Sequence, residues 1–218
     1  MKKLFVPLTL VGVAIFAVAP FLILNAPYES TMGLVQKIFY FHVPAGMTMF
    51  LAAFVSGIGS AVYLFSRKPW ADRMAVAGAE VTVALGIIVM ITGPLWARKA
   101  WGVWWQWDAR LTSTLVMWLI FNAYLLLRRY GGPGSDRLAA AVGLFGMANV
   151  PFVYWSVNFW RTLHPKTSVV PTLPSGMKGL FWLCVLGFTL VTALLVMLRS
   201  ELEKRRQQLD ALYLASED

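Results

Sequence analysis

Long apolar stretches separated by short polar connections dominate the pattern of hydrophobic and polar residues along the chain. A helix needs about 20 apolar residues to cross the roughly 30 Å core of a bilayer, and six stretches approach or exceed that length. They span residues 4–24, 44–65, 75–95, 112–127, 138–156 and 179–198. The pattern therefore predicts an all-α polytopic membrane protein with six transmembrane helices.

Composition supports a membrane location and excludes several other classes of protein. Hydrophobic residues make up 59% of the 218 residues and charged residues 13%, whereas soluble domains are about 25% charged. A single cysteine, Cys184, excludes an internal disulfide and a C-x-x-C-H haem attachment site. The net charge of +9 arises from cations at the ends of apolar stretches, which favours contact with anionic lipid over nucleic acid.

The distribution of lysine and arginine predicts the orientation. With the N-terminus in the cytoplasm, 12 of the 19 basic residues lie on the cytoplasmic side, so the positive-inside rule favours N-in and C-in. The first stretch resembles a signal peptide, but it is longer than a signal core and Pro20 follows the small residues, so we expect a retained span. Residues 1–218 are predicted to form one integral-membrane domain, with 199–218 as a cytosolic helical tail.

Half of the ten tryptophans fall in the connection between the third and fourth predicted helices, on the outer face. They are Trp96, Trp101, Trp104, Trp105 and Trp107. Such a cluster can form a platform for a large planar ligand such as haem, because indole rings stack on π-systems. Arg98, Lys99 and Arg110 flank it and can pair with carboxylates. The alternative is an aromatic belt that anchors the protein at the membrane interface.

The only two histidines follow the first and fifth predicted spans, so the topology places them on the same face as the tryptophans. Met32, Val35, Phe39 and His42 recur at helical spacing and predict a short interfacial helix that ends at His42. Pro165 favours an extended conformation at His164. Two imidazoles can supply both axial ligands of a haem iron. A capping or surface role is the alternative for each.

Two acidic residues have open roles. Glu80 lies within the third predicted span, where it is either functional or bonded to a neighbouring helix. Asp108 either supports a ligand or caps the fourth helix. No paired carboxylates, P-loop, nucleophile elbow or H-E-x-x-H motif is present, so we do not expect an enzyme.

The sequence W-G-V-W-W-Q-W-D-A-R-L-T from Trp101 to Thr112 resembles the "WWD" signature of haem-handling proteins. Within that superfamily the chain is similar along its whole length to the cytochrome c maturation protein C, or haem exporter protein C, family. The similarity includes F-H-V-P around His42 and R-T-L-H-P around His164.

This resemblance implies a function and a set of site residues. His42 and His164 would be the axial ligands of a non-covalently bound haem b, and Trp101, Trp104, Trp105, Trp107 and Asp108 would hold the macrocycle. The protein would lie in the bacterial inner membrane and present haem at its periplasmic face to a haem chaperone, maturation protein E. Its other partners would be an ATP-binding subunit, a membrane subunit and a small single-span subunit, equivalent to maturation proteins A, B and D.

Two other functions fit part of the sequence. A membrane electron-transfer subunit would also bind haem b, but such proteins usually place histidine ligands within helices that face each other across a bundle. A permease without a cofactor would leave the tryptophan cluster unexplained.

Overall fold

The computed structural model describes residues 2–28 and 32–217, which form six α-helices and two short 3₁₀ helices. The α-helices are α1 (Lys2–Asn25), α2 (Phe39–Ser66), α3 (Pro69–Trp101), α4 (Ala109–Tyr130), α5 (Ser135–Phe159) and α6 (Ser175–Glu217). The 3₁₀ helices are η1 (Leu34–Ile38) and η2 (Thr167–Val169). Each α-helix is long and apolar enough to cross a membrane, which confirms the six predicted spans by length and composition.

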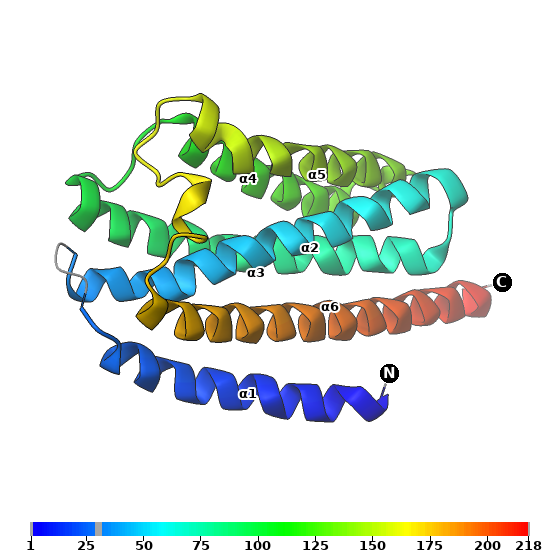
Figure 1. Cartoon of the computed structure of the whole chain (residues 1–218). Coiled ribbons are helices and arrows are strands. Elements are labelled where there is room, and N and C mark those ends of the chain that lie inside the picture. Colours follow the sequence, from blue (N-terminus) through cyan, green and yellow to red (C-terminus); the bar gives the residue numbers. More distant parts are fainter. Residues whose placement is uncertain (1, 29–31, 218) are drawn as a thin grey trace.

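The helices run side by side along one axis, with α1 next to α6 at one edge of the bundle and α4 and α5 at the other (Figure 1). Both ends of the chain lie at the same end of the bundle, which we call the terminal end. The α1–α2, α3–α4 and α5–α6 connections meet at the opposite end, which we call the histidine end because His42 and His164 lie there. The six-span topology predicts this grouping.

Small residues allow α2 and α3 to pack closely at the centre of the bundle. A Cβ atom at Gly78 would lie 2.6 Å from the backbone nitrogen of Ser56, so the approach of the two helices requires glycine there. The Ser56 hydroxyl donates a hydrogen bond to the carbonyl of Ala75 at 2.8 Å. Small residues and hydroxyl hydrogen bonds stabilise helix pairs in lipid. This contact fixes the two helices whose ends form much of the functional site.

The predicted interfacial helix ending at His42 is wrong. The structure has the shorter η1, which runs directly into α2, and His42 lies in the first turn of α2. Ile38 and Phe39 both have right-handed helical backbone angles, so nothing separates the two helices. Periodicity alone does not show where one helix passes into the next.

The third helix is longer than predicted. It continues past residue 95 as far as Trp101, so Trp96 and Trp101 are helical and the connection begins at Gly102. Gly102 ends the helix because its φ of 77° lies in the left-handed region, which glycine adopts without strain. The tryptophan cluster is therefore divided between the last turns of α3 and a short connection to α4.

Candidate functional site

The histidine end contains a cavity of about 470 Å³, a volume typical of small-molecule sites. Its walls come from α2 to α6 and from the segment between α5 and α6. Most of the lining side chains are apolar. The polar ones are Gln36, His42, Arg110, Thr114, Tyr154, His164, Lys166 and Thr167. Both histidines thus line one cavity, although 121 residues separate them in the sequence.

His42 is held by α3 in a defined tautomer. Its Nδ1 lies 2.9 Å from the hydroxyl oxygen of Thr92, and that hydroxyl donates its only proton to the carbonyl of Ile88 at 2.7 Å. The hydroxyl oxygen can therefore only accept from His42, so Nδ1 carries the proton and Nε2 keeps a free lone pair. Gly93 makes room for the ring, because a Cβ atom there would lie 3.2 Å from Cε1 of His42.

His164 has the same tautomer for a different reason. Its Nδ1 lies 2.9 Å from the carbonyl oxygen of Pro165, and a carbonyl can only accept a hydrogen bond. Nδ1 is therefore protonated and Nε2 is again free. Burial, assisted by the positive charge of Arg110, lowers the pKa of His164 to about 4. The imidazole is thus neutral near pH 7, which is the form that binds a metal.

The tryptophans of the cluster fall into two groups. Trp96, Trp101 and Trp105 line the cavity. The indole nitrogen of Trp105 is buried and has no hydrogen-bond partner among the described residues, so it can donate to a ligand. Trp104 and Trp107 are not part of the lining, and 56% and 74% of their surface is exposed. The cluster therefore does not form one continuous platform inside the cavity.

Asp108 caps α4 and also binds the segment that carries His164. One carboxylate oxygen accepts the backbone N–H of Leu111 at 2.8 Å, which is an N-cap hydrogen bond. The other accepts the hydroxyl of Thr162 and the N–H of Leu163. Asp108 is absent from the cavity lining, so its predicted contact with a macrocycle stays a prediction.

Among the three cations predicted to flank the platform, only Arg110 lines the cavity. Its Nη1 donates to the carbonyls of Val153 and Tyr154 at 2.6 and 3.3 Å, and no other hydrogen bond of its guanidinium is present within the described residues. The Nε and Nη2 donors remain for an anionic ligand. Arg98, in contrast, is exposed and binds the carbonyl of Gly102.

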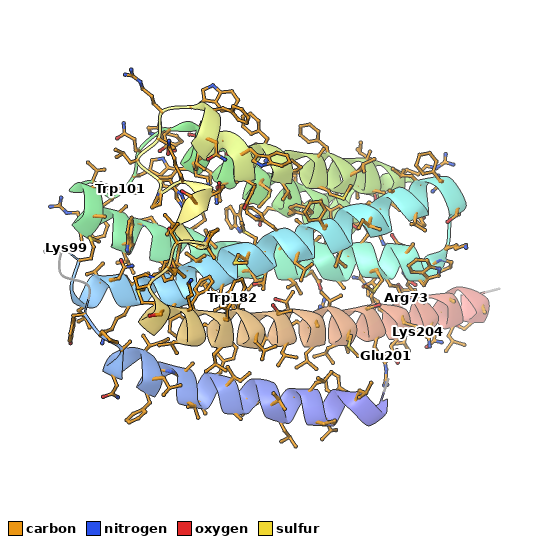
Figure 2. The ribbon with its side chains drawn as sticks, viewed as in Figure 1. Arg73, Lys99, Trp101, Trp182, Glu201 and Lys204 are labelled. Atoms are coloured by element: carbon orange, nitrogen blue, oxygen red, sulfur yellow. The ribbon has the colours of Figure 1, made fainter. Side chains whose placement is uncertain are left out.

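Of the two lysines Lys99 and Lys166, only Lys166 lines the cavity. Lys99 is exposed near the tip of α3, as Figure 2 shows, and does not line the cavity. Lys166 was not among the cations expected to bind a ligand, yet it lines the cavity two residues after His164. The cavity thus contains two cations, one from α4 and one from the segment between α5 and α6.

Comparison with known proteins gives the family. The model of the family described as Heme exporter protein C matches residues 1–214 of the chain. The chain belongs to this family. It is 37% identical to the Heme exporter protein C of Bradyrhizobium diazoefficiens over 190 residues, which cover 83% of this chain and 72% of that protein. It is 31% identical to the Heme exporter protein C of Escherichia coli K12 over 208 residues, which cover 87% and 80%.

A more distant relative comes from a plant. The chain is 29% identical over 184 residues to an Arabidopsis thaliana protein named as a putative cytochrome c biosynthesis ccmC-like mitochondrial protein. These residues cover 79% of this chain and 70% of the plant protein. The resemblance to the haem exporter protein C family that the tryptophan and histidine motifs indicate is therefore confirmed.

The site of this haem exporter family member differs from the sequence-based expectation at three residues. Trp96 was predicted as part of the tryptophan platform, but in a connection and not on a helix. It follows Val89 and Gly93 at helical spacing on α3, and all three line the cavity. Thr92 was missed because nothing in the sequence pairs it with His42. Trp182 comes from α6, as Figure 2 shows, and only the packing of the bundle brings it to the cavity.

Proposed function

We propose that this chain binds haem b non-covalently in the cavity and delivers it for cytochrome c biogenesis. The observation that carries the proposal is the pair of imidazoles that line one cavity, each with its Nδ1 proton bonded and its Nε2 lone pair free. Haem iron needs only two ligands from the protein because the porphyrin supplies four. His42 and His164 would be these two axial ligands.

The rest of the cavity fits the other parts of a haem. Apolar walls and the rings of Trp101 and Trp105 suit a planar macrocycle, and the unpaired indole N–H of Trp105 can donate to a propionate. Arg110 has guanidinium donors directed to no described partner, which suits a second carboxylate contact. Trp104 and Trp107 are exposed beside this site and can contact a part of the ring that projects from the cavity.

Delivery requires a site that holds haem and also releases it. His42 lies in the first turn of a helix and His164 in a segment outside the helices, so both ligands sit at an end of the bundle and not in its core. A site near the end of a bundle can open with less disruption than one at its centre. We propose that release follows when a partner takes the haem from the exposed side.

Membership of the family supports a proposal for the partners and the location. We propose that the chain lies in the bacterial inner membrane, with the histidine end at the periplasmic face and both termini in the cytoplasm. It would pass haem to a periplasmic haem chaperone, maturation protein E, within an assembly that contains equivalents of maturation proteins A, B and D. The relatives named Heme exporter protein C support haem export, and the excess of basic residues on the terminal side supports this orientation.

Replacing each histidine by glycine tests the ligation. In His42→Gly or His164→Gly one axial position opens. The purified protein should therefore bind haem more weakly, and the iron should be high-spin. Imidazole should fill the vacancy and restore the low-spin absorption spectrum. The double variant should lose most of its haem. A single variant that stays low-spin without imidazole would show that its histidine is not a ligand.

A transfer assay separates delivery from electron transfer. Haem bound to the wild-type protein should move to an apo haem-binding protein added in excess. Haem that stays bound under these conditions, together with reversible reduction, would instead favour an electron-transfer subunit.

A further inference from the structure

The carboxylate of Asp108 is directed toward the segment that carries His164. Its Oδ1 accepts the N–H of Leu111 and so caps α4, which leaves Oδ2 for other partners. Oδ2 accepts the hydroxyl of Thr162 and, at 3.3 Å, the N–H of Leu163. These contacts join the start of α4 to a segment more than fifty residues later in the chain.

Thr162 connects this carboxylate to the histidine. A hydroxyl has one proton to give, and Thr162 gives it to Asp108. Its oxygen then accepts the backbone N–H of His164 at 3.0 Å. The peptide nitrogen of His164 is thus fixed by Thr162, while its ring is fixed on the other side by the carbonyl of Pro165. The segment has no helical hydrogen bonds at these residues to hold it otherwise.

We infer that Asp108 is a positioning residue that holds His164 in place through Thr162. The inference rests on the proposed function, because it gives Asp108 a role in iron ligation without contact between Asp108 and haem. The contact also accounts for the order of the segment, because the carboxylate of the N-cap residue Asp108 anchors it. The start of α4 thus contributes both Arg110, which lines the cavity, and the carboxylate that anchors the second histidine.

Two substitutions separate the two functions of Asp108. In Asp108→Asn the amide oxygen can still cap α4, because asparagine is a favourable N-cap residue, but the amide group that replaces Oδ2 cannot accept from Thr162. In Thr162→Val the carboxylate and the cap both remain, and only the connection to His164 is lost. A direct contact between Asp108 and haem would be removed by the first substitution and unaffected by the second.

The first measurement uses the haem-free protein in detergent. Amide hydrogen exchange at Leu163 and His164 should become about fivefold faster in Thr162→Val and in Asp108→Asn, because each amide loses a hydrogen bond or the residue that orders it. Exchange within α2 should not change, which reports an intact fold. Thr162→Ser should restore slow exchange. Thr172→Val is the matched control, because the Thr172 hydroxyl bonds only to carbonyls of its own turn.

The second measurement uses the ferric haem-bound protein. Both variants should show a larger high-spin fraction, by about the same amount, since His164 would ligate the iron less often. The double variant should be no worse than either single variant, because both changes break one connection. Added imidazole should restore the low-spin state in all three.

The outcomes distinguish this inference from the proposed function. A wild-type protein without a low-spin spectrum would overturn the proposed function itself. A wild-type protein with that spectrum, together with an unchanged Thr162→Val variant and a haem-deficient Asp108→Asn variant, would show that Asp108 acts on the ligand directly. Should Thr162→Val fail to fold, unchanged exchange at Leu163 and His164 in Asp108→Asn would still overturn the inference.

Discussion

Both ends of the bundle carry charged side chains among the helices, but the partners of these side chains differ between the two ends. At the terminal end, acidic and basic side chains pair across helices, and α6 joins these contacts where it passes α3 (Figure 2). The pairs are Asp72 with Arg128 at 2.8 Å, Asp136 with Arg67 at 3.5 Å, and Glu80 with Arg199. In the last pair, Glu80 of α3 binds the neighbouring helix α6.

At the histidine end, three cations bind backbone carbonyls. Arg110, Lys37 and Arg98 donate to the carbonyls of Val153, Leu24 and Gly102 respectively. Within residues 2–28 and 32–217, no carboxylate forms an ion pair with any of these three cations.

The difference separates a structural end from a binding end. Where every buried charge has an opposite charge beside it, the helices are fixed to one another. A cation that has only carbonyl partners is incompletely neutralised, and beside a cavity it favours an anionic ligand. We therefore expect substitutions at the terminal end to change stability and substitutions at the histidine end to change ligand affinity.

Removal of Asp72 should have the largest effect on stability. Asp72→Ala leaves Arg128 without its carboxylate and Gln207 without its acceptor, and breaking a buried ion pair costs about 3–5 kcal/mol. Thermal unfolding in detergent should shift clearly to lower temperature, while the haem affinity of the remaining folded protein should not change.

The control removes the second charge as well. Asp72→Ala combined with Arg128→Met should recover much of the lost stability, because no unpaired charge remains. If Asp72→Ala weakened haem binding at unchanged thermal stability, the division between the two ends would be wrong.

Arg110 should have the largest effect on affinity. Charge-assisted hydrogen bonds contribute about 1.5–3 kcal/mol, so Arg110→Met should weaken haem binding by about 10- to 100-fold. The wild-type protein should also prefer haem over haem dimethyl ester, which lacks the carboxylates, and the variant should lose that preference. Arg98→Met is the matched control and should bind both ligands like the wild type. Equal affinity of the wild type for haem and its ester would contradict an anionic contact.

Much of the fold could be predicted from sequence because the bilayer sets the length of its elements. Six apolar stretches of the right length gave six helices, and alternate connections lie at one end because each helix crosses the bilayer once. The end of α3 was less predictable, because Trp96 and Trp101 fit equally well on a helix or in a connection. The start of α2 was less predictable because η1 runs directly into it. Only Gly102 marks where α3 ends.

The candidate site was predictable by residue type but not by contact. The two histidines were identifiable because no others exist, and the tryptophans because they cluster in sequence. The sequence could not show that Trp105 lines the cavity while Trp107 faces outward, since the side chains in a non-helical connection follow no fixed period. It also could not show that Thr92 bonds to His42 across two helices.

Trp105 and Trp107 offer a smaller but selective effect. Trp105→Ala removes a cavity wall and the unpaired indole donor, and an aromatic contact contributes about 0.5–1.5 kcal/mol beyond its buried area, so haem affinity should fall about tenfold. Trp107→Ala should change haem affinity by less than about twofold, because 74% of the surface of Trp107 is exposed and the residue does not line the cavity. Haem titration in detergent measures both. Equal losses would favour a platform that includes the exposed rings.

Thr92 should have the smallest effect and the most specific one. Thr92→Val removes the acceptor for the Nδ1 proton of His42 without changing the size of the side chain, and the loss of one such hydrogen bond costs about 1 kcal/mol. Haem affinity should fall about fivefold, and the reduction potential of the bound haem should rise, because an imidazole without that acceptor is a weaker electron donor to iron. Thr92→Ser keeps the hydroxyl and should behave like the wild type. A potentiometric titration of the three proteins decides the matter: if the potential of Thr92→Val equals that of the wild type, His42 does not ligate the iron through the tautomer that Thr92 selects.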